Sequence, residues 1–196
     1  SKATSRGAVA KFASGGKATT KKDLGAIARS YGDVYVAHIA LGANEAQAVR
    51  ALLEADAWPG PSLVIAYSTC IAHGFDMSKS MSRMKDAVRS GYWPLYRYRP
   101  TGSATGQPFV LDSKAPTMPL RSFAMNEARF AILTRTDPAR AEQLLSLAQA
   151  DVDERRRYYE QLAALERSVP SEYAEDSDAA TSAALTTGRT HDEEGA

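Results

Sequence analysis

Cysteine is nearly absent from this sequence of 196 residues, and the single one, Cys70, has no partner for an internal disulfide. Chains without disulfides are typical of reducing compartments, so we expect a cytoplasmic protein. No apolar run approaches the roughly 20 residues that span a bilayer. The first residues also lack the apolar segment of a signal peptide. We therefore expect neither membrane insertion nor secretion.

An excess of charge of one sign is also missing, since 24 lysines and arginines face 23 acidic residues and leave a net charge of +1. Nucleic-acid-binding domains are usually basic, so no nucleic-acid partner is expected. The charges are unevenly spread, however, because residues 1–29 are basic and residues 171–196 are acidic. The acidic end has few large apolar residues and no periodic pattern, which predicts a disordered tail.

Between these ends, strand and helix patterns alternate. Residues 33–41 and 62–67 are apolar runs rich in β-branched residues, as buried strands are. Asn44 has the character of a helix N-cap, and Gln47 completes a pair that resembles a capping box. The apolar residues of the helix that follows share one face: Val49, Leu52 and Leu53. Strand, helix and strand in this order predict a parallel βαβ unit, and hence an α/β fold.

The second half of the chain is predicted to be mainly helical, over residues 80–90, 121–133 and 138–167. Asp137 and Pro138 form a favourable N-cap and first-turn pair for the last of these helices. The last helix also carries an apolar stripe: Leu144, Leu145, Ala148, Val152 and Leu162. We expect this stripe to pack on the α/β part or on a second subunit. Residues 92–100 alternate as a strand does, and Pro94 favours an edge position.

Cys70 follows the strand at residues 62–67, at the end of a parallel sheet where ligands bind. The residues alone leave three interpretations open. Cys70 is a small buried apolar residue, a nucleophile with His73 as its base, or a ligand of a metal or iron–sulfur cluster. The second interpretation lacks an evident orienting group. The third needs three more cysteines from outside this chain, since a cluster usually takes four.

Other candidate motifs are less complete. Residues 14–19 suggest a phosphate-binding loop, but Lys11 and Ala18 replace the glycine and hydroxyl residues that such a loop needs. The three histidines are too scattered for a metal site: His38, His73 and His191. Since His38 lies inside a predicted strand, it is expected to be a hydrogen-bonded core residue. Residues 155–159 are expected to be a charged helix face.

Four stretches carry a resemblance to a known family: residues 1–37, "PSLVIAYSTCIAHGFDM" at 61–77, "SGYWPLYRYRP" at 90–100 and "FVLDSKAPTMPL" at 109–120. From residue 1 to about residue 165, the chain resembles the C-terminal part of pyruvate:ferredoxin (flavodoxin) oxidoreductase. Ser5 stands where that family often has proline, and Thr69 stands where it often has histidine or proline.

The resemblance implies that residues 1–119 are the last part of a thiamine-diphosphate-binding fold, a parallel sheet with flanking helices. Residues 120–170 would then be a helical arm that precedes the tail at 171–196. That family oxidatively decarboxylates pyruvate to acetyl-coenzyme A and passes electrons through [4Fe–4S] clusters to ferredoxin or flavodoxin. Its motifs for thiamine diphosphate and Mg²⁺ lie upstream of the matching segment, so neither falls within this chain.

One functional residue follows from the resemblance: Cys70 would be the fourth ligand of the cluster nearest the thiamine, with the other three upstream. The N–H groups of residues 71–74 are expected to hydrogen-bond the cluster sulfurs and raise its potential. The implied partners are the missing N-terminal domains, a second copy in a homodimer, and the acceptor protein, with pyruvate and coenzyme A as substrates. We expect no activity from this chain alone.

Two other functions stay open. The chain begins with Ser1, which suggests processing or the end of a longer chain. It could instead be a free-standing truncated remnant, or a subunit module that acts in assembly without catalysis. An independent hydrolase built on Cys70 and His73 is the third possibility.

Overall fold

The computed structural model describes residues 4–100 and 106–166. Within them, four strands form one sheet in the order β2-β1-β3-β4. The strands are β1 (Tyr35–Ile39), β2 (Ser62–Ala66), β3 (Tyr96–Tyr98) and β4 (Phe109–Leu111). The helices are α1 (Leu24–Arg29), α2 (Glu45–Ala57), α3 (Ser80–Arg89), α4 (Leu120–Ala124), α5 (Ala128–Thr136) and α6 (Pro138–Ala163), with short 3₁₀ helices η1 (Ile71–His73) and η2 (Met77–Lys79). The predicted α/β class is confirmed.

The sheet is mixed rather than fully parallel. β1 and β2 are parallel neighbours in the sheet, paired from Tyr35–Ser62 to Ile39–Ala66, and α2 connects them along the chain. This arrangement confirms the predicted βαβ unit. β3 pairs antiparallel with β1, and β4 pairs antiparallel with β3. The predicted parallel arrangement therefore holds for β1 and β2, and the two strands beside them are antiparallel. A connection as short as that between β3 and β4 joins antiparallel strands, whereas parallel strands need a long crossover.

The edge position predicted from Pro94 is also wrong, because β3 lies between β1 and β4. β3 begins at Tyr96, two residues after the proline. Pro94 thus takes no part in the hydrogen-bonded ladder, and its missing N–H group costs the strand nothing. The free edge of the parallel pair is instead β2.

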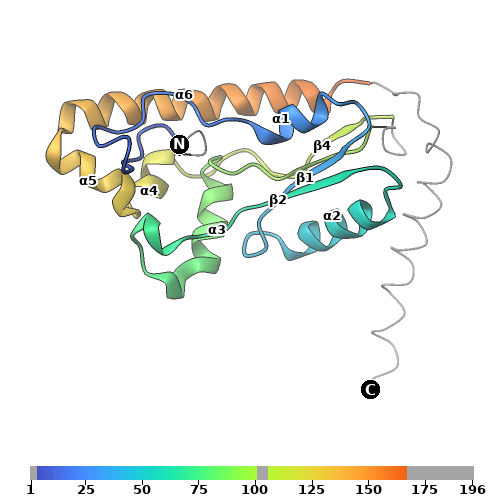
Figure 1. Ribbon diagram of the computed structural model, residues 1–196, viewed down its shortest axis with the longest axis horizontal. Helices are drawn as coiled ribbons and strands as arrows, with labels where there is room; N and C mark the ends of the chain where they lie inside the picture. Colours follow the sequence, from blue (N-terminus) through green and yellow to red (C-terminus); the bar gives the residue numbers. More distant parts are fainter. Residues whose placement is uncertain (1–3, 101–105, 167–196) are drawn as a thin grey trace, which may run out of the picture.

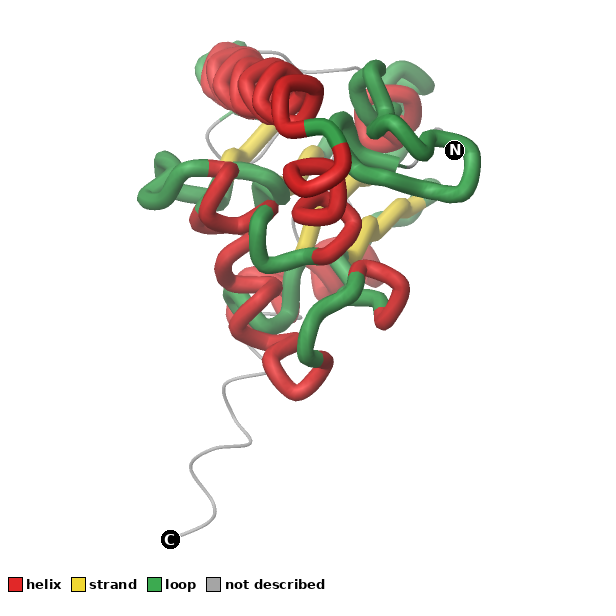
Figure 2. The backbone as a smooth tube through the Cα atoms, turned by 90° about the vertical axis from the view of Figure 1, so that its left-hand side faces the viewer, coloured by secondary structure: helices red, strands yellow, loops and turns green. Residues whose placement is uncertain are grey.

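Helices cover both faces of the sheet (Figure 1). On one face, Tyr35, Ala37 and Ile39 of β1 pack against α2. On the other face, Val36 packs with Tyr96 of β3 and with residues of α1 and α6. Figure 2 shows the strands between these helical layers. Because β1 is buried on both faces, its sequence is a continuous apolar run rather than an alternating one.

The start of α2 follows the sequence prediction, but its buried face does not. The Asn44 side chain accepts a hydrogen bond from the Gln47 N–H group at 3.0 Å, which confirms the N-cap. The Gln47 amide, however, donates to the His38 carbonyl and to Asp112 instead of closing a capping box. Val49 and Leu52 are each about half exposed. Small residues such as Ala48 and Ala51 face the sheet instead, so the helix approaches it closely.

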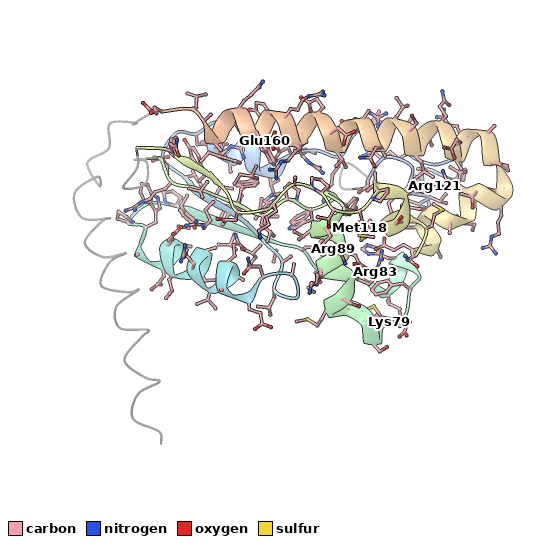
Figure 3. The ribbon with its side chains drawn as sticks, turned by 180° about the vertical axis from the view of Figure 1, so that it is seen from behind. Lys79, Arg83, Arg89, Met118, Arg121 and Glu160 are labelled. Atoms are coloured by element: carbon pink, nitrogen blue, oxygen red, sulfur yellow. The ribbon has the colours of Figure 1, made fainter. Side chains whose placement is uncertain are left out.

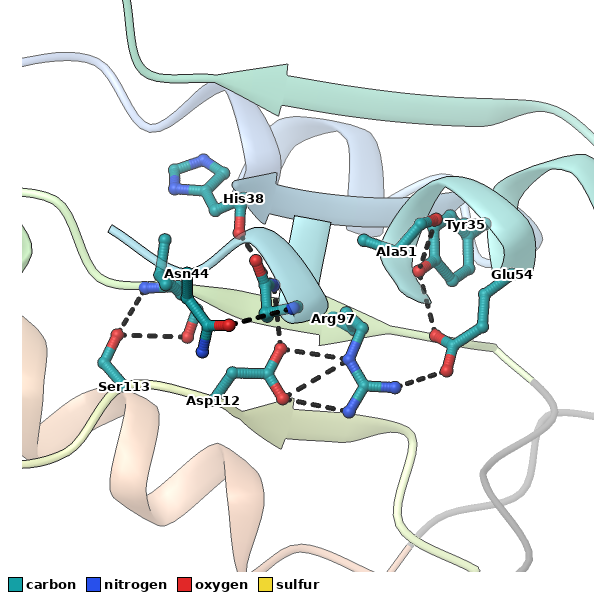
Figure 4. Close-up of polar contacts among 10 residues, drawn as sticks. Tyr35, His38, Asn44, Ala51, Glu54, Arg97, Asp112 and Ser113 are labelled. Atoms are coloured by element: carbon teal, nitrogen blue, oxygen red, sulfur yellow. Dashed lines mark hydrogen bonds and ion pairs between the residues drawn. The ribbon is translucent and has the colours of Figure 1, made fainter. Parts of the chain in front are cut away.

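A polar network under α2 holds the helix to the antiparallel strands (Figure 4). Arg97 of β3 contacts Asp112 with two nitrogens, Nη2 at 2.9 Å and Nε at 3.0 Å, and also pairs with Glu54 of α2. The Tyr35 hydroxyl donates to the same Glu54 carboxylate at 3.0 Å. Each buried charge therefore has a partner, as burial requires.

The helical second half packs on the sheet. Asp137 caps α6 by accepting a hydrogen bond from the Arg140 N–H group at 3.0 Å, as predicted. The predicted apolar stripe is largely buried: Leu144, Leu145, Ala148 and Val152 contact the rest of the chain, and Leu162 is half-buried. Ala148 and Val152 pack on the α/β part, as expected. Leu144 and Leu145 pack mainly against α4, α5 and the segment near Ala8.

The helix predicted over 121–133 is in fact two helices, α4 and α5, separated by a turn at residues 125–127. The expected tail at 171–196 lies outside the described residues, and the domain boundaries at 119 and 170 stay predictions. No helix within residues 4–100 and 106–166 is long and apolar enough to cross a membrane.

Candidate functional site

Cys70 lies on the loop after β2, beyond the carboxyl ends of the parallel pair. The Tyr67 N–H group bonds the Ile39 carbonyl at 2.9 Å, so the ladder continues one residue past β2. Cys70 is extended, with φ −138° and ψ 139°, and immediately precedes η1. It is a free and exposed cysteine. Exposure contradicts the interpretation of Cys70 as a buried packing residue.

The loop that follows Cys70 folds back on itself. The His73 N–H group donates to the Cys70 carbonyl at 2.9 Å, and the Gly74 N–H group donates to the Ile71 carbonyl at 3.0 Å. These two amides are therefore engaged, and the expectation that all four amides of 71–74 face a cluster is wrong. The N–H groups of Ile71 and Ala72 have no partner among the described residues, because they open the 3₁₀ turn.

Gly74 fixes this loop against the start of α5. It has φ +70°, a conformation that favours glycine. A Cβ atom at this position would lie only 2.5 Å from the Ala128 Cβ atom. The Gly74 carbonyl also accepts a hydrogen bond from the Ala128 N–H group at 3.0 Å. The close approach and the hydrogen bond together fix the position of the Cys70 loop relative to the start of α5.

A buried charge cluster lies where the loop meets α5. Its centre is Glu127, whose side chain is 0% exposed. Arg83 Nη2 lies 3.1 Å from Glu127 Oε1, and Arg129 Nε lies 2.7 Å from Oε2. Figure 3 shows Arg83 on α3, close to the segment that carries α4 and α5. Arg83 Nη1 also lies 3.8 Å from the Asp86 carboxylate, so two guanidiniums face two carboxylates, of which only Glu127 is fully buried.

Aromatic and hydroxyl groups enclose the charge cluster. The Arg83 guanidinium lies 4.3 Å from the Phe123 ring centroid and 5.9 Å from that of Phe75, in the loop after η1. Arg129 Nη2 donates to the Tyr92 hydroxyl at 3.3 Å. The sequence analysis did not predict Arg83, Glu127 or Arg129 as site residues. Their neighbours in the sequence resemble those of exposed charged residues.

His73 does not form a catalytic pair with Cys70 in the described contacts. The two residues share a backbone hydrogen bond, and none joins the thiol to the imidazole. Burial lowers the pKa of His73, and repulsion from Arg129 adds to the shift. Its Nδ1 atom is buried without a partner in the described part of the chain. No third group therefore orients this imidazole as a base.

His38 is a core residue, but stacking rather than hydrogen bonding holds its ring. The imidazole lies between Trp93, at 4.5 Å between ring centroids, and Tyr96, at 4.4 Å. Its Nδ1 atom has no hydrogen-bond partner in residues 4–100 and 106–166. Burial lowers the pKa of His38 to about 3, so the ring is neutral at physiological pH. His191 lies outside the described residues.

Part of the charged face expected at 155–159 points inward. Tyr159 is buried and donates to Asp23 at 3.0 Å. Arg155 Nη2 donates to the carbonyls of Gly91 at 2.8 Å and Tyr92 at 3.0 Å. Asp23 also caps α1, a helix that the sequence analysis did not predict. These contacts close a cavity between α6 and the sheet.

The described residues do not assemble a metal site by themselves. No group of three or more histidine, cysteine, aspartate or glutamate side chains could hold an ion within residues 4–100 and 106–166. The loop at 14–19 is irregular and presents no complete phosphate-binding motif. Cys70 is thus the one predicted ligand that the structure places on an exposed loop at the expected end of the sheet.

Comparison with known proteins gives close relatives. No protein-family model matches the chain. It is 52% identical over 164 residues to the pyruvate:ferredoxin oxidoreductase of Moorella thermoacetica. It is 50% identical over 166 residues to the pyruvate-flavodoxin oxidoreductase of Klebsiella pneumoniae. It is also 45% identical over 166 residues to the pyruvate dehydrogenase (NADP+) of Cryptosporidium parvum.

The first two matches take in 83% of this chain and the third takes in 79%. The chain, in turn, spans only 14% of the length of the first two relatives and 9% of the third. The chain therefore belongs, as a segment, to the family of pyruvate:ferredoxin and pyruvate-flavodoxin oxidoreductases.

Proposed function

We propose that this chain is the C-terminal part of an oxidoreductase that decarboxylates pyruvate to acetyl-coenzyme A, and that Cys70 binds a [4Fe–4S] cluster in it. The observation that carries the proposal is the position of Cys70. It is the only cysteine of the sequence, and it is exposed on a fixed loop at the carboxyl end of a parallel strand pair. A lone cysteine in such a place fits a ligand that completes a cluster held mainly by another segment.

The groups on this loop are suited to bind one iron atom of a cluster. A thiolate from Cys70 would be the iron ligand, and the N–H groups of Ile71 and Ala72 are the nearby donors left for cluster sulfur. The other three thiolates must come from outside this chain. When bound, a [4Fe–4S] cluster supplies one-electron transfer, here toward ferredoxin or flavodoxin. Thiamine diphosphate and Mg²⁺ are assigned to the upstream part, and no residue of this chain is proposed to bind them.

The buried charge cluster supports the neighbouring loop. Arg83 pairs with Glu127 and with the half-buried Asp86, and Arg129 pairs with Glu127, so two guanidiniums face two carboxylates. Glu127 immediately precedes Ala128, whose N–H group holds the Gly74 carbonyl of the loop. We assign Arg83, Glu127 and Arg129 the role of fixing the Cys70 loop.

The unpaired edge of β2 is consistent with pairing to a strand from another part of the enzyme. Parallel strands are normally covered on both sides, yet the central residues of β2 are half-buried and its ends are exposed. The strand carries no lysine, proline or bulge to protect the edge. We propose that a strand from the missing N-terminal portion pairs there, and that the complete enzyme is a cytoplasmic homodimer.

A second candidate is a free-standing remnant or subunit module without catalysis. The observation that favours it is the core, because the stripe on α6 is covered by other parts of the same chain. Because the stripe is buried within the chain, it needs no cover from the rest of the enzyme. The two candidates differ in whether coding sequence for the other ligands lies upstream of Ser1 or in a partner chain.

The test combines gene structure with cofactor binding. An open frame upstream that contains the diphosphate motif and further cysteines would support the first candidate, and a stop codon there would favour the second. The isolated chain is expected to bind neither thiamine diphosphate in calorimetry nor stoichiometric iron after anaerobic reconstitution. Stoichiometric binding of either one would contradict the proposal.

A further inference from the structure

A cavity of about 300 Å³ lies between α6 and the sheet, on the face opposite α2. The N-terminal segment around Ser5 and residues 20–24 forms its outer wall. In Figure 1 this segment runs alongside α6. The volume is at the lower end of the range for small-molecule sites. At about 30 Å³ for each water-sized group, it holds about ten heavy atoms.

The walls of the cavity are largely apolar. They include Trp93, Leu120, Phe130 and Leu145, together with the His38 ring. His38 adds no charge, since burial keeps its imidazole neutral at physiological pH. Its Nδ1 atom has no hydrogen-bond partner among the described residues. Filling the space with hydrocarbon would remove apolar surface from water, which favours a ligand with an apolar body.

Lys21 gives the cavity a positive charge. Its Nζ atom lies 4.9 Å from the Trp93 ring centroid. The Lys21 side chain is exposed along its length, but protein atoms around its ammonium group displace water and lower its pKa, and repulsion from Arg155 and Arg129 adds to the shift. No ion pair with Lys21 occurs within residues 4–100 and 106–166. An anion beside this ammonium would relieve both effects.

Two acidic residues at the cavity are already engaged. Asp23 accepts hydrogen bonds from the Ala26 N–H group and the Tyr159 hydroxyl. Asp151 pairs with Arg6, at 2.6 Å between Oδ2 and Nε. A third, Glu154, is exposed on α6. The ammonium of Lys21 is thus left for an external anion.

We infer that this cavity binds a small carboxylate with an apolar chain of about eight carbons. The carboxylate would pair with Lys21, and the chain would lie among the apolar walls. Of the other cations that line the cavity, Arg6 pairs with Asp151, and Arg155 donates to two backbone carbonyls. Lys22 is exposed. The one ammonium of Lys21 beside the aromatic wall matches the single charge of a carboxylate. This site is separate from the Cys70 loop and does not depend on the cluster assignment.

Calorimetric titration of the 196-residue chain with sodium octanoate tests the site, and amide NMR shifts locate it. Octanoate is expected to bind with shifts at the cavity walls. Lys21→Met should weaken binding about tenfold or more, because a charge-assisted pair is lost. Lys85→Met removes the same charge from exposed α3 and should leave binding unchanged. Butyrate should bind about 200-fold more weakly, since it lacks four methylenes and each contributes about fourfold.

Charge reversal gives a second readout that does not rely on loss of binding. Lys21→Glu should bind octylammonium better than octanoate, while the wild-type chain should prefer octanoate. Equal affinity of the wild-type chain for the two ligands would overturn the inference. So would an absence of octanoate binding, unchanged binding by Lys21→Met, or NMR shifts confined to other surfaces.

Discussion

The guanidinium of Arg83 lies 3.1 Å from the carboxylate of Glu127, a side chain that solvent does not reach. This ion pair joins α3 to the first residue before α5. Because Ala128 in turn bonds the Gly74 carbonyl, the pair also supports the loop that carries Cys70. The stability of the protein and the position of its candidate ligand therefore depend on the same contact.

The first prediction concerns the centre of this cluster. Glu127→Gln keeps the shape of the side chain but removes the countercharge of Arg129 and leaves Arg83 only the half-buried Asp86, at 3.8 Å. Breaking a buried pair in this way costs about 3–5 kcal/mol. Chemical denaturation should show a loss of this size. Glu142→Gln is the control, since its pair with Arg121 is exposed and should contribute about 1 kcal/mol or less. Equal losses for the two variants would contradict the assignment.

The second prediction concerns Gly74. Gly74→Ala adds the strain of a positive φ and a contact with Ala128. Gly32 is the matched control, because it has φ +96° and no neighbouring atom within 4 Å of an added Cβ. Gly32→Ala should cost about 1–2 kcal/mol. Gly74→Ala should cost about 1–3 kcal/mol more and should increase amide hydrogen exchange in residues 70–74. Indistinguishable unfolding free energies would show that the Ala128 contact is not tight.

The third prediction is a pH dependence from His38. The pKa of His38 is about 3 in the folded chain and 6.5, the ordinary value for histidine, in the unfolded chain, so only the unfolded chain binds the proton between these values. Stability should therefore fall as the pH falls from 6.5 toward 3. At pH 5 the loss from this residue is about 2 kcal/mol. His38→Phe keeps a ring between Trp93 and Tyr96 and should remove this part of the acid sensitivity, as measured by denaturation at pH 7 and pH 5.

Carboxylates also titrate in this range, so the informative quantity is the difference between the wild-type chain and His38→Phe. If both lose the same free energy of unfolding between pH 7 and pH 5, the imidazole is not held neutral by burial.

The fourth prediction concerns the free edge of β2. An unprotected apolar edge strand pairs with other chains. We expect the isolated chain to self-associate in a concentration-dependent way in sedimentation velocity. Lysine at the two exposed ends of the strand, Ser62→Lys with Ala66→Lys, should reduce this association. Lys at exposed positions of α2, Val49→Lys with Leu52→Lys, removes apolar surface elsewhere and should have less effect. The reverse order would place the association surface on α2.

The sequence predicts those features that depend on neighbouring residues. The N-caps at Asn44 and Asp137 are local, and each makes its predicted hydrogen bond. The parallel unit around α2 follows from apolar runs of strand length. Cys70 is placed correctly for the same reason, because the end of its strand is visible in the sequence.

Features that depend on distant residues could not be predicted in this way. Arg83 and Glu127 are 44 residues apart in sequence, and neither differs locally from an exposed charge. The antiparallel pairing of β3 with β1 also depends on contacts between residues far apart in the sequence. Val49 and Leu52 mislead because α2 uses small residues against the sheet. If the missing portion covers α2, their exposure belongs to the fragment alone.

The central claim is that Cys70 binds a cluster, and its most direct test is the iron content and EPR spectrum of the complete oxidoreductase carrying Cys70→Ala. Alanine is used because a serine oxygen could itself bind iron. Ile71→Ala, at an adjacent exposed residue, is the control. The account predicts that Cys70→Ala loses one [4Fe–4S] cluster and slows reduction of the acceptor, while thiamine diphosphate binding is unchanged. Full iron content, an unchanged spectrum and an unchanged reduction rate would contradict it.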